Sequence, residues 1–290
     1  MGIEKVGVVG FGTMGSGIAQ VCAVAGFHVR VRDVEQRFLD RGRERIAQSL
    51  ARIVKAGRLT DEQARAALGR IHGTLALADL ADRDLVIEAV VEEIGAKNAV
   101  FAELDEVCGP AAIFTSNTSS LTIVEMATAT KRADRFAGLH FFNPPMMMRL
   151  VEIVEAITTS DATIEVLRSF VTRLGHTGVV SKDTTGFIVN RLLQPYLNSA
   201  VRMLEQGVAT AEQIDAAMKL GLGHPMGPLE LIDHTGVDIV YHIGNIFFEE
   251  FRDPALAPPS LLRRMYLAGR LGVKSGRGFY EYDVKGKRKT

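Results

Sequence analysis

The chain of 290 residues has few cysteines, and this scarcity excludes a disulfide framework. Its two cysteines, Cys22 and Cys108, fit a reducing compartment. Neither has metal-ligand spacing or a neighbouring base typical of a reactive thiol. We therefore expect both to be structural, and we expect no metal site.

Net charge and long apolar runs are also lacking. The 34 basic and 34 acidic residues give a formal net charge of zero, so no global attraction to nucleic acid or an anionic membrane is expected. The locally basic residues 285–289 are interpreted as a solvated terminus. No apolar run approaches the roughly 20 residues of a membrane span, and no signal-peptide pattern precedes the first predicted strand. We expect a cytoplasmic protein without nucleic-acid or membrane partners.

The chain does have a glycine motif close to its start. An apolar strand over residues 5–9 leads into Gly10-Phe11-Gly12-Thr13-Met14-Gly15, and a helix is predicted over residues 15–25. In such a motif the first glycine allows a tight turn, the second lets the backbone approach a pyrophosphate, and the third lets the helix pack against the strand. The partly positive helix N-terminus then faces the phosphates. The motif predicts dinucleotide binding.

An acidic residue follows this motif at the distance typical of NAD sites. The second predicted strand, residues 28–32, ends at Asp33, which is suited to a hydrogen bond with the ribose 2′-hydroxyl. Arg32 could instead bind a 2′-phosphate, which leaves NADP as the alternative. Asp33 would repel that phosphate, so NAD is favoured.

Short apolar strands alternate with amphipathic helices through the first 183 residues, as in a mainly parallel sheet covered by helices. The predicted strands are residues 5–9, 28–32, 74–77, 85–89, 113–116, 136–141, 150–154 and 177–180. The predicted helices include residues 35–56, 94–107 and 162–174.

Beyond residue 183 the strand-like runs disappear and helical periodicity takes over. Helices are predicted over residues 186–206, 211–220, 229–251 and 260–268. The predicted fold is a Rossmann-type α/β N-terminal domain, residues 1–183, followed by an all-α C-terminal domain, residues 184–290. The second domain's helices are apolar enough that we expect them to bury against a partner subunit in a homodimer.

Two predicted strands that flank one short connection carry candidate acid–base residues. His140 lies in the first and Glu152 in the second, and Asn143-Pro144-Pro145 between them indicates a turn. If these strands are neighbours, the two side chains can face each other, and an imidazole oriented by a carboxylate is suited to general acid–base catalysis. A buried histidine in an apolar strand is more often a core residue, so the pattern alone leaves both interpretations open.

Several stretches occur in one order along the chain and carry a family resemblance. They are residues 9–15 (VGFGTMG), 116–121 (SNTSSL), 138–144 (GLHFFNP), 150–152 (LVE), 182–191 (KDTTGFIVNR), 224–228 (HPMGP) and 276–280 (GRGFY). Over essentially its whole length the chain resembles the 3-hydroxyacyl-CoA dehydrogenase family, most of all its short bacterial 3-hydroxybutyryl-CoA dehydrogenases.

The resemblance implies an oxidoreductase of fatty acid metabolism that interconverts (S)-3-hydroxyacyl-CoA, expected to be 3-hydroxybutyryl-CoA, and 3-ketoacyl-CoA by hydride transfer with NAD. It implies that His140 is the catalytic acid and base and that Glu152 is its paired carboxylate. It also implies that Ser119 and Asn190 hydrogen-bond the reacting oxygens of the substrate.

The resemblance implies further contacts with the cofactor and with CoA. The residues implied to line the cofactor site are the glycine loop (Gly10, Phe11, Gly12, Thr13, Met14 and Gly15), Asp33 at the adenosine ribose, and Glu92, Lys97, Asn117, Ser119, Asn143 and Lys274. In the family the helix at residues 35–56 contacts CoA, which makes Ser49 and Lys55 candidate substrate-binding residues. Met146-Met147-Met148 departs from the family pattern and could either line an acyl pocket or pack as a loop.

Three other functions compete with this interpretation. A lysine-dependent β-hydroxyacid dehydrogenase would use Lys182 to carry the proton, but it would not require His140 and Glu152. A dehydrogenase of the same family could act on a free hydroxy acid such as L-gulonate. A non-catalytic dinucleotide-binding protein would be expected to have lost His140, Glu152 or Asn190, all of which are present.

Overall fold

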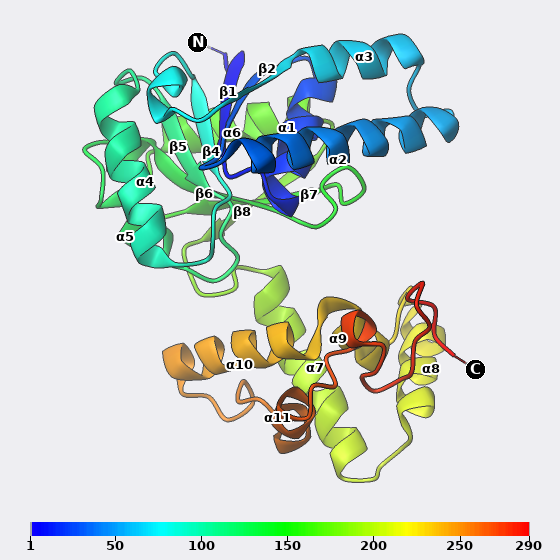
Figure 1. Cartoon of the computed structure of the whole chain (residues 1–290). Helices are drawn as coiled ribbons and strands as arrows, with labels where there is room; N and C mark the ends of the chain where they lie inside the picture. Colours follow the sequence, from blue (N-terminus) through cyan, green and yellow to red (C-terminus); the bar gives the residue numbers. More distant parts are fainter. Residues whose placement is uncertain (1, 290) are drawn as a thin grey trace. The chain divides into compact units, whose positions relative to one another are not determined.

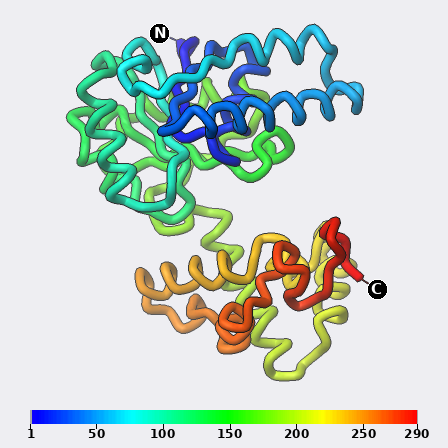
Figure 2. Tube along the Cα trace, in the orientation of Figure 1, coloured from blue at the N-terminus to red at the C-terminus, as the bar shows by residue number. Residues whose placement is uncertain are grey.

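The structure is a computed structural model that describes residues 2–289, and it divides into two compact units. The first unit ends at Phe187 and the second begins at Ile188. Figures 1 and 2 follow the chain through each unit, with the first in blue to green and the second in yellow-green to red. Phe187 packs into the core of the first unit, which explains why that unit continues past Asp183.

One eight-stranded sheet forms the centre of the first unit, in the order β3-β2-β1-β4-β5-β6-β7-β8. The strands are β1 (Lys5–Val9), β2 (His28–Arg32), β3 (Ile71–Thr74), β4 (Leu85–Glu88), β5 (Ile113–Ser116), β6 (Phe136–Phe141), β7 (Leu150–Glu155) and β8 (Thr177–Lys182). The strands β1 to β6 run parallel, whereas β7 is antiparallel to β6 and β8 is parallel to β7. The strand order reverses between β1 and β4, and ligands of such sheets bind in the crevice outside the carboxyl ends at that point.

Helices cover both faces of this sheet (Figure 1). On one face α1 (Thr13–Val24) and α6 (Asp161–Arg173) share a core with the sheet. On the other face α4 (Ile94–Val107) and α5 (Ile123–Ala127) build a second core. Strands β4, β5 and β6 are buried along their whole length, as is usual for parallel strands covered by helices on both faces.

The second unit is helical, as the sequence predicts. Its helices are α7 (Val189–Glu205), α8 (Ala211–Leu222), α9 (Pro228–Thr235), α10 (Val237–Phe251) and α11 (Ser260–Leu267). After α11, isolated β-bridges organise the last described residues, such as the bridge between Tyr282 and Arg288. The fold class predicted from the sequence is therefore confirmed in both halves. None of the helices within residues 2–289 combines the length and the hydropathy needed to cross a membrane.

The predicted strand at residues 74–77 is wrong. The strand is Ile71–Thr74, and a short 3₁₀ helix, Leu77–Leu80, follows it. Backbone pairing with β2 sets this position, since Val29 lies opposite Ile71 and Arg32 opposite Thr74. Only Ile71 of β3 is fully buried, so the strand lacks the apolar pattern that marks the others.

Two helical assignments also need correction. The predicted helix over residues 229–251 is two helices, α9 and α10, separated by Gly236 with φ of 111°. The helix α3 (Asp61–Gly69) was not predicted, although Thr60 and Gln63 form a capping box at its start. In Figure 1, α3 returns beside α2 (Gln36–Lys55) as a helical hairpin.

The helix α2 has one glycine that the glycine loop requires. A Cβ atom at Gly42 would lie 2.1 Å from Cδ1 of the Phe11 ring. Phe11 belongs to the predicted dinucleotide loop, and its side chain is buried. The absence of a side chain at Gly42 therefore leaves space for the Phe11 ring, which belongs to the glycine loop.

We predict that Gly42→Ala destabilises the protein by about 1–3 kcal/mol, because the added methyl group overpacks the Phe11 ring. Displacement of Phe11 should also weaken NADH binding. Thermal unfolding and fluorescence titration with NADH measure the two effects. Gly69→Ala is the matched control, because that helical glycine of α3 has open space around its Cβ position. Wild-type stability and NADH affinity in Gly42→Ala would contradict the prediction.

Candidate active site

The glycine loop after β1 forms a cradle that fits a pyrophosphate. Gly10 has φ of +92°, and its Cβ would lie 2.5 Å from the carbonyl oxygen of Ala89. A Cβ on Gly15 would lie 1.8 Å from the carbonyl oxygen of Gly10, so a larger residue would break the close packing of α1. Gly12 faces open space and caps α1 without any side-chain hydrogen bond, which leaves the helix N-terminus suited to an anion. Thr13 and Met14 form the first turn of that helix.

Asp33 lies beside this cradle at the end of β2. One of its carboxylate oxygens accepts a hydrogen bond from the Phe11 amide at 2.7 Å, and the other accepts one from the Val34 amide at 2.7 Å. The Arg32 side chain donates instead to the carbonyl oxygen of Leu75 at 3.3 Å. The carboxylate is therefore fixed at the glycine loop.

His140 and Glu152 lie directly opposite each other in the antiparallel pair of β6 and β7. Nδ1 of His140 lies 2.7 Å from Oε2 of Glu152, and the two side chains are only 8% and 1% exposed. The rings of Phe142 and Phe187 lie 4.6 Å and 5.6 Å from the imidazole, measured between centroids. A carboxylate at Nδ1 fixes the tautomer with hydrogen on that atom, so Nε2 is the ring nitrogen that can exchange a proton with a substrate.

Phe187 packs against this histidine in an unusual backbone conformation. Its φ is +51°, in the left-handed region that bulky residues rarely adopt, and its side chain is 3% exposed. Such strain persists only where surrounding packing fixes it, and it concentrates at functional sites. The residue was not singled out in the sequence, although it stands in the stretch 182–191 that carries the family resemblance.

The loop after β5 is held by hydrogen bonds to the end of β6 and to Glu92. The Asn117 side chain accepts a hydrogen bond from the Phe141 amide at 2.9 Å. The Ser119 amide donates to Glu92 Oε1 at 3.1 Å, and the hydroxyl groups of Thr118 and Ser120 donate to the same oxygen. This loop therefore places the half-buried Ser119 at the carboxyl edge of the sheet.

Glu92 is ionised in this arrangement. Burial raises the pKa of its carboxyl group, but the nearby Lys97 ammonium and the hydrogen bonds from Thr118 and Ser119 outweigh burial and lower the pKa below its ordinary value. Oε2 of Glu92 lies 3.2 Å from Nζ of Lys97. Lys97 is itself 1% exposed, so a cation is buried among carboxylates at the start of α4.

A second carboxylate at this point was missed by the sequence reasoning. Glu88 is the last residue of β4 and is fully buried. It accepts hydrogen bonds from Lys97 Nζ at 2.7 Å, from the Val90 amide at 2.6 Å and from the Ser116 hydroxyl at 2.6 Å. An acidic residue at the end of a continuous apolar run was the available signal.

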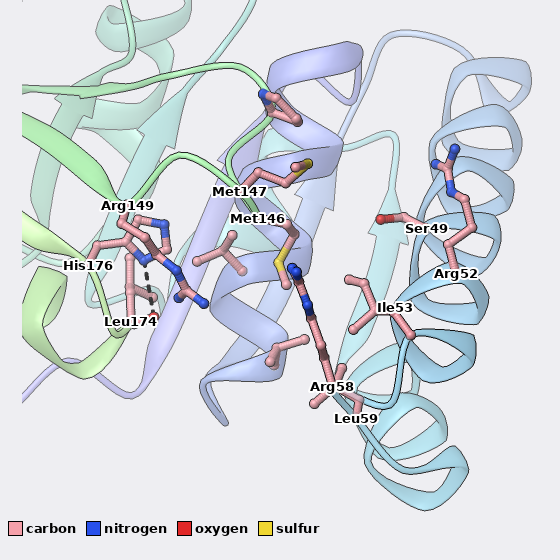
Figure 3. A pocket seen from close by; sticks show the side chains of 14 residues that line it. Ser49, Arg52, Ile53, Arg58, Leu59, Met146, Met147, Arg149, Leu174 and His176 are labelled. Carbon is pink, nitrogen blue, oxygen red and sulfur yellow. Dashed lines mark hydrogen bonds between the residues drawn. The ribbon is translucent and has the colours of Figure 1, made fainter. Parts of the chain in front are cut away.

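A cavity of about 590 Å³ opens between α2, the end of α1 and the segment after His140 (Figure 3). Ser49 and Arg52 of α2 face Met146 and Met147 across it, while Arg149 and other lining residues complete the wall. Those others are Val21, Val24, Ile53, Ala56, Arg58, Leu59, Pro144, Leu174 and His176. The cavity thus combines apolar methionine surface with three guanidinium groups.

The remaining candidates lie in different surroundings. Asn143 is exposed at the end of β6, and Lys55 is exposed on α2 and is not among the residues that line the cavity. Asn190 lies in the first turn of α7 in the second unit. In the same unit Lys274 lies 2.6 Å from Asp238 Oδ1. Lys182, the proton carrier of the rival enzyme class, is exposed and lies 2.6 Å from Glu155.

Comparison with known proteins matches nearly the whole chain to one family. Residues 5–184 match the NAD-binding domain of 3-hydroxyacyl-CoA dehydrogenases, and residues 186–282 match the C-terminal domain of the same enzymes. The chain belongs to the 3-hydroxyacyl-CoA dehydrogenase family. Its cofactor is accordingly NAD, which agrees with the glycine cradle and Asp33.

Relatives of known name align with this chain over nearly its full length. A 3-hydroxybutyryl-CoA dehydrogenase of Mycobacterium tuberculosis is 50% identical and aligns over 97% of this chain and 99% of its own. One from Bradyrhizobium diazoefficiens is 48% identical, with 97% and 96% aligned. The crystal structure of (S)-3-hydroxybutyryl-CoA dehydrogenase from Ralstonia eutropha superposes with a TM-score of 0.94 at 43% identity and covers 97% of this chain and 99% of its own.

We predict that Glu152→Gln lowers turnover by about 100-fold, because a neutral amide loses the charge that stabilises the imidazolium. The fold should persist, since the amide oxygen can still accept a hydrogen bond from His140. Steady-state oxidation of NADH and far-UV circular dichroism measure these effects. Glu155→Gln makes the same chemical change in the same strand, outside the pair, and should retain near-normal turnover. Equal turnover in the two variants would count against the pairing.

Proposed function

We propose that this protein is an NAD-dependent (S)-3-hydroxyacyl-CoA dehydrogenase whose substrate is 3-hydroxybutyryl-CoA. The observation that carries the proposal is the buried pair of His140 and Glu152 at the carboxyl edge of a dinucleotide-binding sheet. The names of the full-length relatives support the same acyl-CoA substrate.

The reaction requires a base for the substrate hydroxyl and an acceptor for hydride. Bound NAD supplies the acceptor. His140 Nε2 takes the hydroxyl proton during oxidation and returns it to the carbonyl oxygen during reduction. Glu152 holds the opposite ring nitrogen and stabilises the imidazolium form, which favours proton uptake by His140 during oxidation.

Ser119 and Asn190 are proposed to donate hydrogen bonds to substrate oxygens that gain negative charge. One such donor can stabilise a transition state by about 3 kcal/mol. Glu92 fixes the backbone of Ser119, and that bond supports a preorganised position for its hydroxyl group. Asn190 lies in the first turn of α7, and Lys274 remains a proposed cofactor-binding residue.

The cavity beside α2 is proposed to hold the CoA portion of the substrate. CoA carries several phosphates, and Arg52, Arg58 and Arg149 are suited to bind them. The Met146 and Met147 side chains offer adaptable apolar surface next to those charges. Ser49 faces the same space (Figure 3). Lys55, exposed near the end of α2, remains a candidate for electrostatic attraction of the CoA phosphates.

The test of the proposed function is NADH oxidation with acetoacetyl-CoA, longer 3-ketoacyl-CoAs and free acetoacetate. We expect acetoacetyl-CoA to be reduced far more efficiently than the free acid, because free acetoacetate lacks the CoA handle. His140→Gln should keep NADH affinity and the fold but lower turnover by about 100- to 10,000-fold.

His72→Gln supplies the control, since His72 is exposed on β3. Comparable activity on free acetoacetate would instead favour a hydroxy-acid dehydrogenase. A solved structure that is 31% identical to this chain is a diketoreductase of dicarbonyl compounds, and this likeness is the reason to test that alternative. Near-normal turnover in His140→Gln would refute the acid–base assignment. Repeating the assay with NADPH measures the preference for NAD.

We also infer a homodimer formed through the helical unit. Large apolar side chains remain exposed on its helices, and Leu220 is 87% exposed. The others on these helices are Leu192, Met203, Leu222, Ile239, Ile246 and Leu267. Burial of such surface favours association.

Sedimentation equilibrium at micromolar concentration should give twice the chain mass of 31.6 kDa. A monomeric mass under those conditions would contradict the dimer.

A cytoplasmic location is part of the same proposal. Cys22 and Cys108 are both unpaired and buried, as expected for a reducing compartment. Burial raises the pKa of both thiols, that of Cys108 to about 11, so they stay protonated near neutral pH and are poor nucleophiles.

A further inference from the structure

Three charged side chains form a connected group at the carboxyl ends of β4 and β5. Lys97 Nζ lies 2.7 Å from Glu88 Oε1 and 3.2 Å from Glu92 Oε2. We call these residues the Glu88–Lys97–Glu92 triad. Glu88 and Lys97 are buried, whereas the Glu92 side chain is 40% exposed at the edge.

The hydrogen bonds around Glu88 indicate that it is ionised. Oε1 accepts from both the Val90 amide and the Lys97 ammonium. The Ser116 hydroxyl oxygen accepts from the Thr118 amide at 3.2 Å, so its own proton is available to Glu88 Oε2. Two carboxylates therefore share one ammonium, and the triad carries one net negative charge.

The triad adjoins the glycine loop at the point where the strand order reverses. Glu88 holds the Val90 amide, and Val90 and Ala89 are the residues that a Cβ on Gly10 would strike. Asp33 stands on the other side of the loop, at the end of β2. A dinucleotide lies across this crevice. If its adenosine half reaches Asp33, its nicotinamide half extends toward β4 and β5, where the triad lies.

We propose that the net negative charge of the triad, to which Glu88 contributes a fully buried carboxylate, determines which oxidation state of the cofactor the site prefers. The nicotinamide ring is positively charged in NAD⁺ and neutral in NADH. A buried negative charge nearby stabilises NAD⁺ selectively, and its effect is stronger in a low-dielectric interior than in water. Glu88 thus acts through charge, in addition to holding Val90 and Ser116 in place.

The experiment compares dissociation constants for NAD⁺ and NADH in the full-length protein without acyl-CoA. NADH is titrated by fluorescence and NAD⁺ by calorimetry. Glu88→Gln keeps the size of the side chain but removes its charge, so the ratio of the NAD⁺ constant to the NADH constant should rise by roughly three- to ten-fold. Glu92→Gln should raise the ratio in the same direction, and it tests the proposal independently if Glu88→Gln fails to fold.

Ser116→Ala is the matched control, because it removes a hydrogen bond to Glu88 without changing the charge. It should leave the ratio at the wild-type value even if both constants increase. The proposal is overturned if Glu88→Gln weakens both cofactors equally, or if Ser116→Ala shifts the ratio as much as the charge variants do. The proposal rests on the dinucleotide site of the proposed function. The titrations contain no acyl-CoA. A negative result would therefore contradict this proposal without contradicting the proposed reaction with acyl-CoA.

Discussion

The register between β6 and β7 is the constraint on which the candidate site depends. Directly opposed residues of an antiparallel pair project side chains to the same face, and His140 and Glu152 are such a pair. A shift of one residue would turn Glu152 to the other face and leave a buried imidazole without its carboxylate. The antiparallel direction of β7 relative to β6 therefore brings the two catalytic candidates together. It places two residues only twelve positions apart in hydrogen-bond contact, across a connection that also contributes to the cavity wall.

Carboxylates that accept backbone amides position the loops around this pair. Asp33 holds Phe11 in the glycine loop, Glu88 holds Val90 after β4, and Glu92 holds Ser119 after β5. An ionised carboxylate accepts stronger hydrogen bonds than a neutral group does. Loops that are free to move in many proteins are therefore fixed here by charge-assisted bonds, which is the preorganisation that binding and catalysis require.

Much of this fold could be predicted from the sequence, because the central strands are buried on both faces and the glycine motif stands in its normal strand–helix context. The position of β3 could not, since only Ile71 of its four residues is buried and pairing with β2 decides the register. The break at Gly236 was hidden because apolar residues continue on both sides of it. Local periodicity reports burial, whereas strand pairing and helix breaks depend on distant neighbours.

The site shows the same division between local pattern and tertiary contact. The pairing of His140 with Glu152 was suggested by two strands and a turn, but the pattern alone favoured a core histidine, and only the family resemblance reversed that preference. Glu88 remained hidden because its partners Lys97 and Ser116 come from other elements, the helix α4 and the strand β5. A buried acid at the end of an apolar strand is costly unless donors surround it, so its presence in the sequence implies partners without identifying them.

The second unit uses buried carboxylates in the same way but without a cation. Asp233 accepts bonds from the Phe279 and Tyr280 amides and from the Tyr282 hydroxyl, and it ties the last segment of the unit to α9. Burial raises the pKa of Asp233 despite these bonds. In the triad, by contrast, the Lys97 ammonium neutralises the charge of one of the two carboxylates.

The two pKa shifts have opposite consequences for stability. A raised pKa means that ionisation of Asp233 opposes folding as pH rises. Its anchoring therefore carries an electrostatic cost, whereas the lowered pKa of Glu92 means that its negative charge is stabilised by the fold. A charge held in that way remains at neutral pH, where it can act on a bound cofactor.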